Sequence, residues 1–286
     1  GDVWDDEETW AKVLPGLQYG YPDLPSMRQL AREAKERPGD RAAFEQFFLG
    51  RRQDNSLSPF VDMHVFDEGK VDELPILDDL PCWVSGDMAS TTDLAAVMAC
   101  FPDGDDFILK CWAFVPADNL QARADRDGVP YPRWAKQGWI IPTAGNVIDF
   151  RVIEQHIRDL CEQYDVREIA FDPQYSAPVL APLTDDGFPT LTIRQGWVTQ
   201  SPALNVLERA IIGRHVKWES PVLRWCMENV AIHTDTNGNR TIHKGKSKDR
   251  VDLASAAWMA VSRAAANDSN VSIYSTDARP SGLLVI

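Results

Sequence analysis

Blocks of apolar residues, separated by short polar turns, predict a run of strands from Leu80 and, after it, helices that alternate with further strands. From Leu80 onward three apolar runs follow one another: PCWVSGDM, LAAVMACF and FILKCWAFV. Their connections, STTD and PDGDD, are short and polar, which is typical of an antiparallel meander. Asp149 can cap the helix that comes later, in which apolar residues recur at helical spacing. The apolar run REIAFDP follows that helix directly and predicts a strand that crosses back into the sheet.

The remaining segments complete an α/β pattern. Helices are expected at Ala203 to Ile212, at Pro221 to Val230 and from about Asp249 to Ala265, and the Asn-Gly pair within AIHTDTNGNRTIHK predicts a hairpin. Asp118 to Asn146 lacks clean periodicity and is expected to be a long excursion packed by its aromatic residues. This order of elements is that of the ribonuclease-H-like fold. It predicts a mixed α/β sheet flanked by helices, with strands 1-2-3 antiparallel and the later strands added in parallel.

The first 60 residues differ from the rest of the chain, since three short helices are expected there. Asp5 or Asp6 can cap the first helix, Ser26 opens the second and Asp40 caps the third. We therefore expect a helical lead-in at residues 1–60, a main domain at 61–266 and a polar tail at 267–286. A small decorating subdomain without a function of its own is the alternative interpretation of residues 1–60.

Composition and charge exclude several classes of protein. The chain has 286 residues and a net charge of -14, so its surface as a whole does not suit nucleic acid. The five cysteines form no CxxC pair, which argues against a structural zinc site and favours buried thiols in a reducing compartment. No apolar run is long enough to span a membrane, and the acidic opening GDVWDDEETW lacks the apolar core of a secretion signal.

Three aspartates stand where an α/β sheet exposes the ends of its elements. Asp87 ends the first strand of the meander, Asp172 ends the next predicted strand after the meander, just before Pro173, and Asp252 opens the alanine-rich last helix. Hard cations such as Mg²⁺ prefer carboxylate oxygens, so three converging aspartates predict a metal-dependent nuclease. Each acid also has a structural interpretation, as a turn or cap residue. Asp249 lies one helical turn before Asp252 and is either the N-cap of the helix or a second candidate ligand.

A basic strip precedes the last helix. The segment RTIHKGKSKDR holds five cations that can clamp DNA phosphates or form a solvated loop: Arg240, Lys244, Lys246, Lys248 and Arg250. Asp93, at the entry of the second strand, is a turn residue or a support behind the metal ligands. His233 and His243 flank the hairpin and could assist proton transfer or be structural.

One apparent phosphate-binding motif fails on inspection. Gly245-Lys246-Ser247 ends like a P-loop, but the first glycine of GxxxxGK[ST] would have to stand where Arg240 is. The residues therefore encode no ATP site at this position.

Several of these segments, in this order, resemble the C-terminal nuclease domain of the large terminase subunit of tailed double-stranded-DNA phages. The matching parts are WDDEETWAKVLPGL, GDMASTTDLAA, AFDPQYSAPVLAPL, SPALNVLERAIIGRHVKW, PVLRWCMENV and DTNGNRTIHKGKSKDRVD with the helix after it. The resemblance implies a ribonuclease-H-like endonuclease that cuts concatemeric viral DNA with two divalent metals, Mg²⁺ or Mn²⁺. It carries over to Asp87, Asp172 and Asp252, whereas Asp249 has no firm counterpart.

The resemblance also implies partners and a place of action. It implies double-stranded viral DNA as substrate, an ATPase motor domain, a small terminase subunit and a portal as partners, no membrane, and the host cytoplasm as location. No Walker A motif precedes the nuclease segments, so we interpret the chain as the nuclease half, with residues 1–60 leading to the motor. The rival hypotheses are another ribonuclease-H-like nuclease, such as a resolvase or a transposase core, and a non-catalytic docking module of the packaging motor.

Overall fold

A mixed sheet of seven strands forms the centre of the protein. The computed structural model describes residues 4–36, 44–45, 47–50, 57–88, 94–235, 237–243, 247 and 250–268. Six strands follow one another in the order β5-β4-β3-β2-β6-β7, and β8 pairs separately with β4. The strands are β2 (Pro81–Asp87), β3 (Ala95–Asp103), β4 (Asp106–Pro116), β5 (Ile140–Thr143), β6 (Asp165–Phe171), β7 (Thr190–Thr192) and β8 (Val216–Trp218).

The pairing of these strands confirms the predicted meander and the parallel additions to it. β2 pairs with β3 and β3 with β4, both antiparallel. β6 then joins β2 in parallel, and β7 joins β6 in parallel. β5 and β8 run parallel to β4. A helix must carry the chain back before each parallel strand, which is why helical segments dominate after β4.

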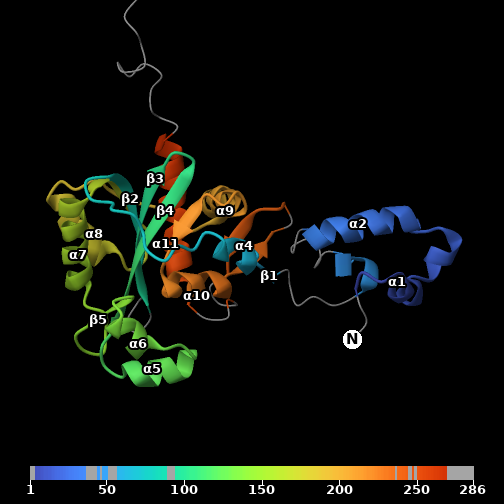
Figure 1. Ribbon diagram of the computed structural model, residues 1–286, viewed down its shortest axis with the longest axis horizontal. Helices are drawn as coiled ribbons and strands as arrows, with labels where there is room; N and C mark the ends of the chain where they lie inside the picture. Colours follow the sequence, from blue (N-terminus) through green and yellow to red (C-terminus); the bar gives the residue numbers. More distant parts are fainter. Residues whose placement is uncertain are drawn as a thin grey trace, which may run out of the picture.

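Helices cover both faces of the sheet (Figure 1). α7 (Phe150–Gln163) and α8 (Ala177–Asp185) pack on one face, around Ile153, Ile157 and Leu183. The helices on the other face enclose the larger core cluster: α9 (Trp197–Ile212), α10 (Pro221–Asn229) and α11 (Asp252–Asp268). The buried face of α11 is rich in alanine, and these small side chains let the helix lie close against β2 and β3.

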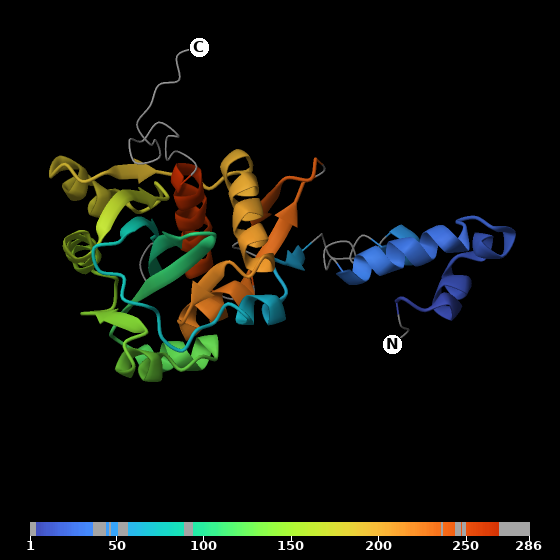
Figure 2. The same ribbon diagram turned by 45° about the horizontal axis from the view of Figure 1, so that its top comes forward.

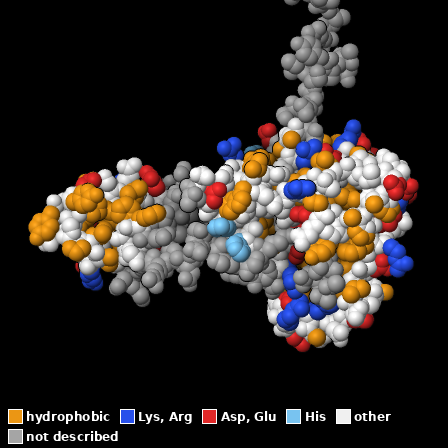
Figure 3. Space-filling model, turned by 180° about the vertical axis from the view of Figure 1, so that it is seen from behind, with side chains coloured by type: hydrophobic (Ala, Val, Ile, Leu, Met, Phe, Trp, Pro, Cys, Tyr) orange, Lys and Arg blue, Asp and Glu red, His pale blue; other side chains and the backbone are white. Residues whose placement is uncertain are grey.

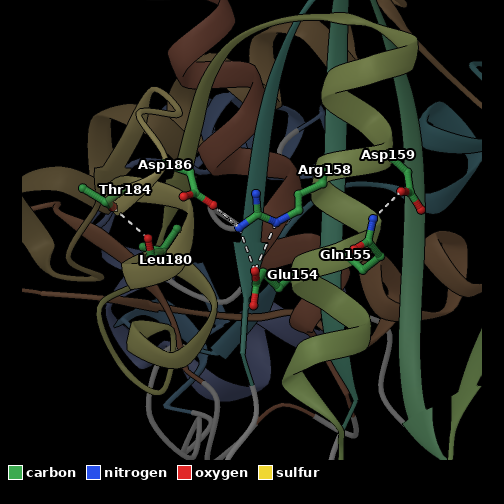
Figure 4. A network of polar contacts seen from close by, with 7 residues as sticks. All are labelled: Glu154, Gln155, Arg158, Asp159, Leu180, Thr184 and Asp186. Atoms are coloured by element: carbon green, nitrogen blue, oxygen red, sulfur yellow. Dashed lines mark hydrogen bonds and ion pairs between the residues drawn. The ribbon is translucent and has the colours of Figure 1, made fainter.

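Polar contacts hold α7 in place beside α8. Asp149 caps α7 as predicted, accepting a hydrogen bond of 3.0 Å from the backbone N of Arg151. Figure 4 shows Arg158 between the two helices, paired with Glu154 at 2.9 Å and with Asp186, after α8, at 2.6 Å. These contacts fix the outer layer on the face of the sheet that is opposite α11.

Residues 118–146 contain more regular structure than their sequence predicts. α5 (Leu120–Asp127), α6 (Tyr131–Lys136) and β5 lie in this excursion. Tyr131 and Trp134 are buried, and both rings contact Trp225 of α10, with centroids 5.9 and 5.8 Å away. These helices are too short to show a helical period, so tertiary packing rather than local pattern decides them.

Two of the later helices begin elsewhere than predicted. α9 begins at Trp197, six residues before the expected Ala203, because Pro202 is accommodated inside the helix. The last helix is described from Asp252, and Asp249 lies outside the described residues. The predicted hairpin is confirmed as β9 (Ala231–Thr234) and β10 (Arg240–Ile242), and β1 (Leu57–Pro59) extends it to three strands.

The N-terminal helices have a small core of their own. α1 (Glu7–Val13), η1 (Pro15–Tyr19) and α2 (Leu24–Glu36) bury Trp10 and Met27 between them. Asp6 caps α1 by accepting a hydrogen bond of 3.1 Å from the backbone N of Thr9, as one of the two predicted caps. Figures 1 and 2 draw these helices apart from the sheet and its layers.

The main body takes in residues before the predicted boundary at position 61. β1 pairs with β9, and α4 (Met63–Asp67) comes after β1, with Phe66 stacked on Trp218 at 4.5 Å. The described chain therefore joins the body at Leu57. The predicted tail begins inside α11, which ends at Asp268.

Two further expectations concern the whole chain. None of the helices in the described residues is long and apolar enough to cross a membrane. All five cysteines are free thiols; Cys82, Cys100 and Cys226 are buried. Burial raises the pKa of the Cys82 thiol to about 12, so it is protonated and unreactive at neutral pH.

A close approach between β2 and β6 requires glycine at position 86. A Cβ on Gly86 would lie 2.2 Å from Cε1 of Phe171, across the parallel strand pair. Gly86→Ala should therefore lower the free energy of unfolding by about 1–3 kcal/mol, because the buried ring has to shift. Urea unfolding monitored by circular dichroism measures this loss.

A double mutant controls for the cause of that loss. Phe171→Leu removes Cε1 and Cζ, the two ring carbons nearest to the added Cβ, so Gly86→Ala should cost less in that background than in the wild type. Equal costs in both backgrounds would show that the clash with Phe171 is not what requires the glycine.

Candidate active site

Asp87 and Asp172 lie side by side at the carboxyl ends of two parallel strands. β2 and β6 pair in a register that ends with Gly86 opposite Phe171, so the next residue on each strand is an aspartate. The backbone N of Asp172 donates to the carbonyl of Gly86 at 3.4 Å, which continues the pairing by one residue. Neighbouring strands lie about 4.8 Å apart, so the two carboxylates start from adjacent backbone positions.

Both aspartates point to the face of the sheet that α11 covers. Ser85, two residues before Asp87, donates from Oγ to the carbonyl of Ala256 on α11 at 2.7 Å. Glu168 stands four residues before Asp172, and its carboxylate binds the guanidinium of Arg263 on α11 at 2.5 and 2.6 Å. Side chains two or four residues apart on a strand share a face.

α11 carries Asp252 to the same end of the sheet. The helix runs opposite to β2, since Ser85 meets Ala256 while Glu168, earlier on the neighbouring parallel strand, meets Arg263. From Ser85 to Asp87 the strand rises by about 6.6 Å. From Ala256 back to Asp252 the helix covers about 6 Å, one full turn on the same side. Asp252 therefore stands level with Asp87.

The three acids differ in burial. Asp87 and Asp172 expose only 2% and 8% of their surface, and Asp252 is half-buried. Oδ1 of Asp172 accepts a hydrogen bond of 2.7 Å from the backbone N of Gln174, a turn contact that also fits the structural interpretation of this residue. Carboxylates gathered in a buried place repel one another, and a divalent cation relieves that repulsion.

The donor chemistry at this end of the sheet suits a hard divalent cation. Mg²⁺ is usually held by one or two carboxylates together with water and substrate phosphate, and Asp87 and Asp172 could supply the carboxylates from adjacent strands. Across the described residues, no three His, Cys, Asp or Glu side chains are placed so that they could hold a metal ion together. The side chains thus provide ligands for a cation without a preformed cage of three.

Several predicted site residues fall outside the described residues: Asp93, Lys244, Lys246, Lys248 and Asp249. The choice between Asp249 and Asp252 on the last helix therefore stays a prediction. So does the contact of the three lysines with phosphate.

The two arginines of the basic strip are engaged within the protein. Arg240 binds Glu208 of α9 through both terminal nitrogens, at 3.0 and 2.7 Å. The Nε of Arg250 lies 3.8 Å from Oδ2 of Asp127, on α5. Figure 3 shows one face of the molecule, where the described lysine and arginine side chains are scattered among acidic ones. Both guanidiniums have an acidic partner within the protein, and their predicted contact with DNA stays a prediction.

The two histidines of the hairpin lie together. Their rings are 5.8 Å apart, and the ring of His233 contacts Trp197 at 5.1 Å. Nδ1 of His243 is buried without a hydrogen-bond partner among the described residues. His243 directly follows Thr241 and Ile242, which line a cleft beside Asp172. The role of His243 as a supporting residue of the site stays a prediction.

This cleft beside Asp172 has a volume of about 600 Å³. Its other walls are the loop before α9, the start of that helix and β10, which supply Arg194, Gln195, Gly196, Trp197, Gln200, Thr241 and Ile242. None of the residues from Arg194 to Trp197 was predicted as a site residue. In the sequence these residues form a short polar segment, RQGW, after the strand β7. The predicted start of α9 at Ala203 leaves this segment away from the end of a helix, so the pattern alone does not mark it as a site.

Comparison with known proteins gives one consistent result. The sequence model of a family described as "Terminase large subunit, endonuclease domain" matches residues 2–268. A curated relative, the large terminase subunit of Enterobacteria phage HK97, is 26% identical over 267 residues, which cover 90% of this chain and 51% of the relative. The chain thus spans about half the length of this relative.

Solved structures agree on the fold. The crystal structure of the HK97 bacteriophage large terminase matches with a TM-score of 0.67 and 24% identity, over 92% of this chain and 55% of that one. A large terminase from the thermophilic bacteriophage D6E matches with a TM-score of 0.50 and 11% identity, over 78% of this chain and 49% of that one. The sheet order and these matches confirm the predicted ribonuclease-H-like fold.

The ion pair that holds the segment before α11 should depend on pH. Burial by itself would raise the pKa of Asp127, but hydrogen bonds from Arg126 and Tyr131, with the charge of Arg250, outweigh it and lower that pKa. A lowered pKa stabilises the fold above the ordinary value, and this contribution is lost as the pH falls through the lowered pKa. Asp127→Asn should therefore reduce the free energy of unfolding at neutral pH by about 1–2 kcal/mol. The difference from wild type should shrink below about pH 3.9.

Urea unfolding at neutral and acidic pH measures this difference. Asp125→Asn, an exposed change on the same helix, is the matched control and should behave like wild type at both pH values. If the two variants are equally stable at neutral pH, the contacts of Asp127 with Arg126, Tyr131 and Arg250 do not stabilise the fold.

Proposed function

The chain belongs to the family of the terminase large subunit endonuclease domain, and from this premise we propose that it is a divalent-metal-dependent endonuclease. Its substrate in this proposal is concatemeric viral double-stranded DNA, cut during genome packaging. The observation that carries the proposal is the placing of Asp87 and Asp172 on adjacent strand ends, facing the helix that begins at Asp252.

The proposed roles of the acids follow from their places in the fold. Asp87 is central because β2 pairs with β6 and also lies under α11. We assign it to two cations, Mg²⁺ or Mn²⁺, with Asp172 as a further ligand of one and Asp252 of the other. When bound, such a pair supplies an activated water and stabilises the leaving oxygen of the phosphodiester.

The protein contributes orientation and partial exclusion of water. The close contact of Gly86 with Phe171 fixes the two strand ends, and the bond from Ser85 to Ala256 sets the level of α11. The low exposure of Asp87 and Asp172 places their charges where electrostatic attraction to a cation is stronger than in water.

The proposed partners of the chain are inferred from its relative, the HK97 large terminase subunit. Because the chain spans about half of the HK97 large subunit, we propose that it acts with an ATPase motor domain, a small terminase subunit and a portal, in the host cytoplasm. Lys244, Lys246 and Lys248 remain our proposed phosphate contacts from the basic strip, supported by their place before α11. In the same way Asp93 and His243 are proposed as supporting residues, and Asp249 is the second choice, after Asp252, for the ligand on the last helix.

A non-catalytic docking module is the second candidate. It is favoured by the turn contact of Asp172 with Gln174, and by the fact that no three His, Cys, Asp or Glu side chains in the described part of the chain could hold a metal ion together. A resolvase or transposase core would use the same acids but belongs to other families, so the family match weighs against it.

The first functional prediction is nuclease activity that requires a metal. Purified chain incubated with supercoiled plasmid and Mg²⁺ or Mn²⁺ should yield nicked and linear DNA with little sequence preference, because the site acts on the phosphodiester. Excess chelator should stop the reaction. Agarose gels measure the products, and cutting that persists in chelator would contradict the two-metal proposal.

The second functional prediction ranks the acids. Asp87→Ala, Asp172→Ala and Asp252→Ala should each reduce nicking by at least about a hundredfold, since each removes a proposed metal ligand. Their thermal unfolding midpoints should stay close to that of wild type.

Asp249→Ala and Asp93→Ala serve as comparison variants that should retain more activity. If Asp249→Ala is inactive and Asp252→Ala cuts like wild type, the proposed ligand on α11 is the wrong residue. If all five variants cut like wild type, the acids are structural and the docking module is the better hypothesis.

A further inference from the structure

Arg194 extends the row of site residues by one strand. β7 pairs with β6 in parallel, with Thr192 opposite Phe171, and Ile193 continues the pairing by donating to the carbonyl of Phe171 at 2.8 Å. The carboxyl ends of β2, β6 and β7 thus lie next to one another and lead to Asp87, Asp172 and Arg194. In open α/β sheets, ligands bind outside the carboxyl ends of such strands.

The charge of Arg194 is available to a ligand. Arg194 is exposed, lines the cleft beside Asp172, and forms no ion pair or side-chain hydrogen bond with the residues that the structure describes. Arg240 and Arg250, in contrast, are paired with Glu208 and Asp127. On a chain with a net charge of -14, an exposed cation in a cleft, without an acidic partner among the described residues, marks a place for an anion.

The amino end of α9 and Gln195 add donors to the same cleft. α9 has 16 residues, and its N-cap, Gly196, provides no side chain to bind the first backbone N–H groups. Both Gly196 and Trp197 line the cleft. The side-chain Nε2 of Gln195 is buried and has no hydrogen-bond partner among the described residues, although an unpaired buried donor costs stability. An anion in the cleft would accept hydrogen bonds from the first backbone N–H groups of α9 and from Nε2 of Gln195.

We propose that this cleft holds the phosphate next to the scissile phosphate on the strand being cut, bound by Arg194, Gln195 and the amino end of α9. The inference rests on the proposed function for the identity of the anion. The spacing supports it, because Arg194 stands one strand beyond Asp172 and two strands beyond Asp87. The half-buried ring of Trp197, held against His233, forms a flat wall for the sugar or base attached to that phosphate.

Salt-dependent DNA binding tests the proposal without relying on cutting. Fluorescence anisotropy of a labelled duplex is measured without divalent metal, in the Asp87→Ala chain, over a range of salt concentrations. Adding Arg194→Ala should weaken binding about tenfold at low salt. It should also make the slope of log affinity against log salt shallower by about 0.9, the value for one lost phosphate contact.

Further variants separate the proposed contacts from general charge. Arg194→Lys should keep the slope. Gln195→Leu should weaken binding at every salt concentration without changing the slope, since it removes a neutral donor. Arg209→Ala is the matched control, because Arg209 is exposed on the last turn of the same helix, away from the cleft, and should bind like the Asp87→Ala parent.

The outcomes distinguish this inference from the proposed function. If Arg194→Ala changes affinity and slope no more than Arg209→Ala does, the phosphate site is refuted, whether or not the wild-type chain nicks plasmid. If the wild-type chain fails to nick plasmid while Arg194→Ala shows the expected loss, the nuclease proposal fails and Arg194 stands as a contact to a DNA phosphate only.

Discussion

The parallel pairing of β2 with β6 is the constraint on which the site depends. It sets Asp87 beside Asp172 only because the register places Gly86 opposite Phe171. The missing side chain at Gly86 leaves room for the ring of Phe171, and the ring directly precedes Asp172. The requirement for close packing on one face of the sheet therefore fixes the position of the acids on the other.

α11 adds the third acid by a different kind of contact. Its alanines let the helix lie close to β2 and β3, and the bond from Ser85 to Ala256 fixes its height along the strand. The pair between Glu168 and Arg263 holds the far part of the helix to β6. Because these two contacts lie one after the other along α11, they fix the direction of the helix as well as its height. Together they place Asp252 level with Asp87.

Charge is distributed around this site in an uneven way. The body is acidic, and two arginines near the start of α11 are neutralised by Glu208 and Asp127, so they support the fold. Arg194, in the cleft beside Asp172, has no such partner in the described part of the chain. In the function that we propose, an acidic protein has to hold DNA through such local cations and through partner subunits.

The sequence by itself determined the meander, the crossover helix capped by Asp149 and the three acids at element ends. These features follow from local rules: apolar runs between short polar turns, helical spacing, capping, and the rarity of aspartate within strands. Only the tertiary structure decided which side chains meet. The short helices α5 and α6 form because Tyr131 and Trp134 pack on Trp225, a contact across some 90 residues that no local pattern encodes. Likewise the pairing of Arg240 with Glu208, and the place of Arg194 at the end of β7, depend on contacts between segments far apart in the chain. A charged residue has the same local sequence whether its partner is a neighbouring helix or a DNA phosphate, and only the fold brings the partner within reach.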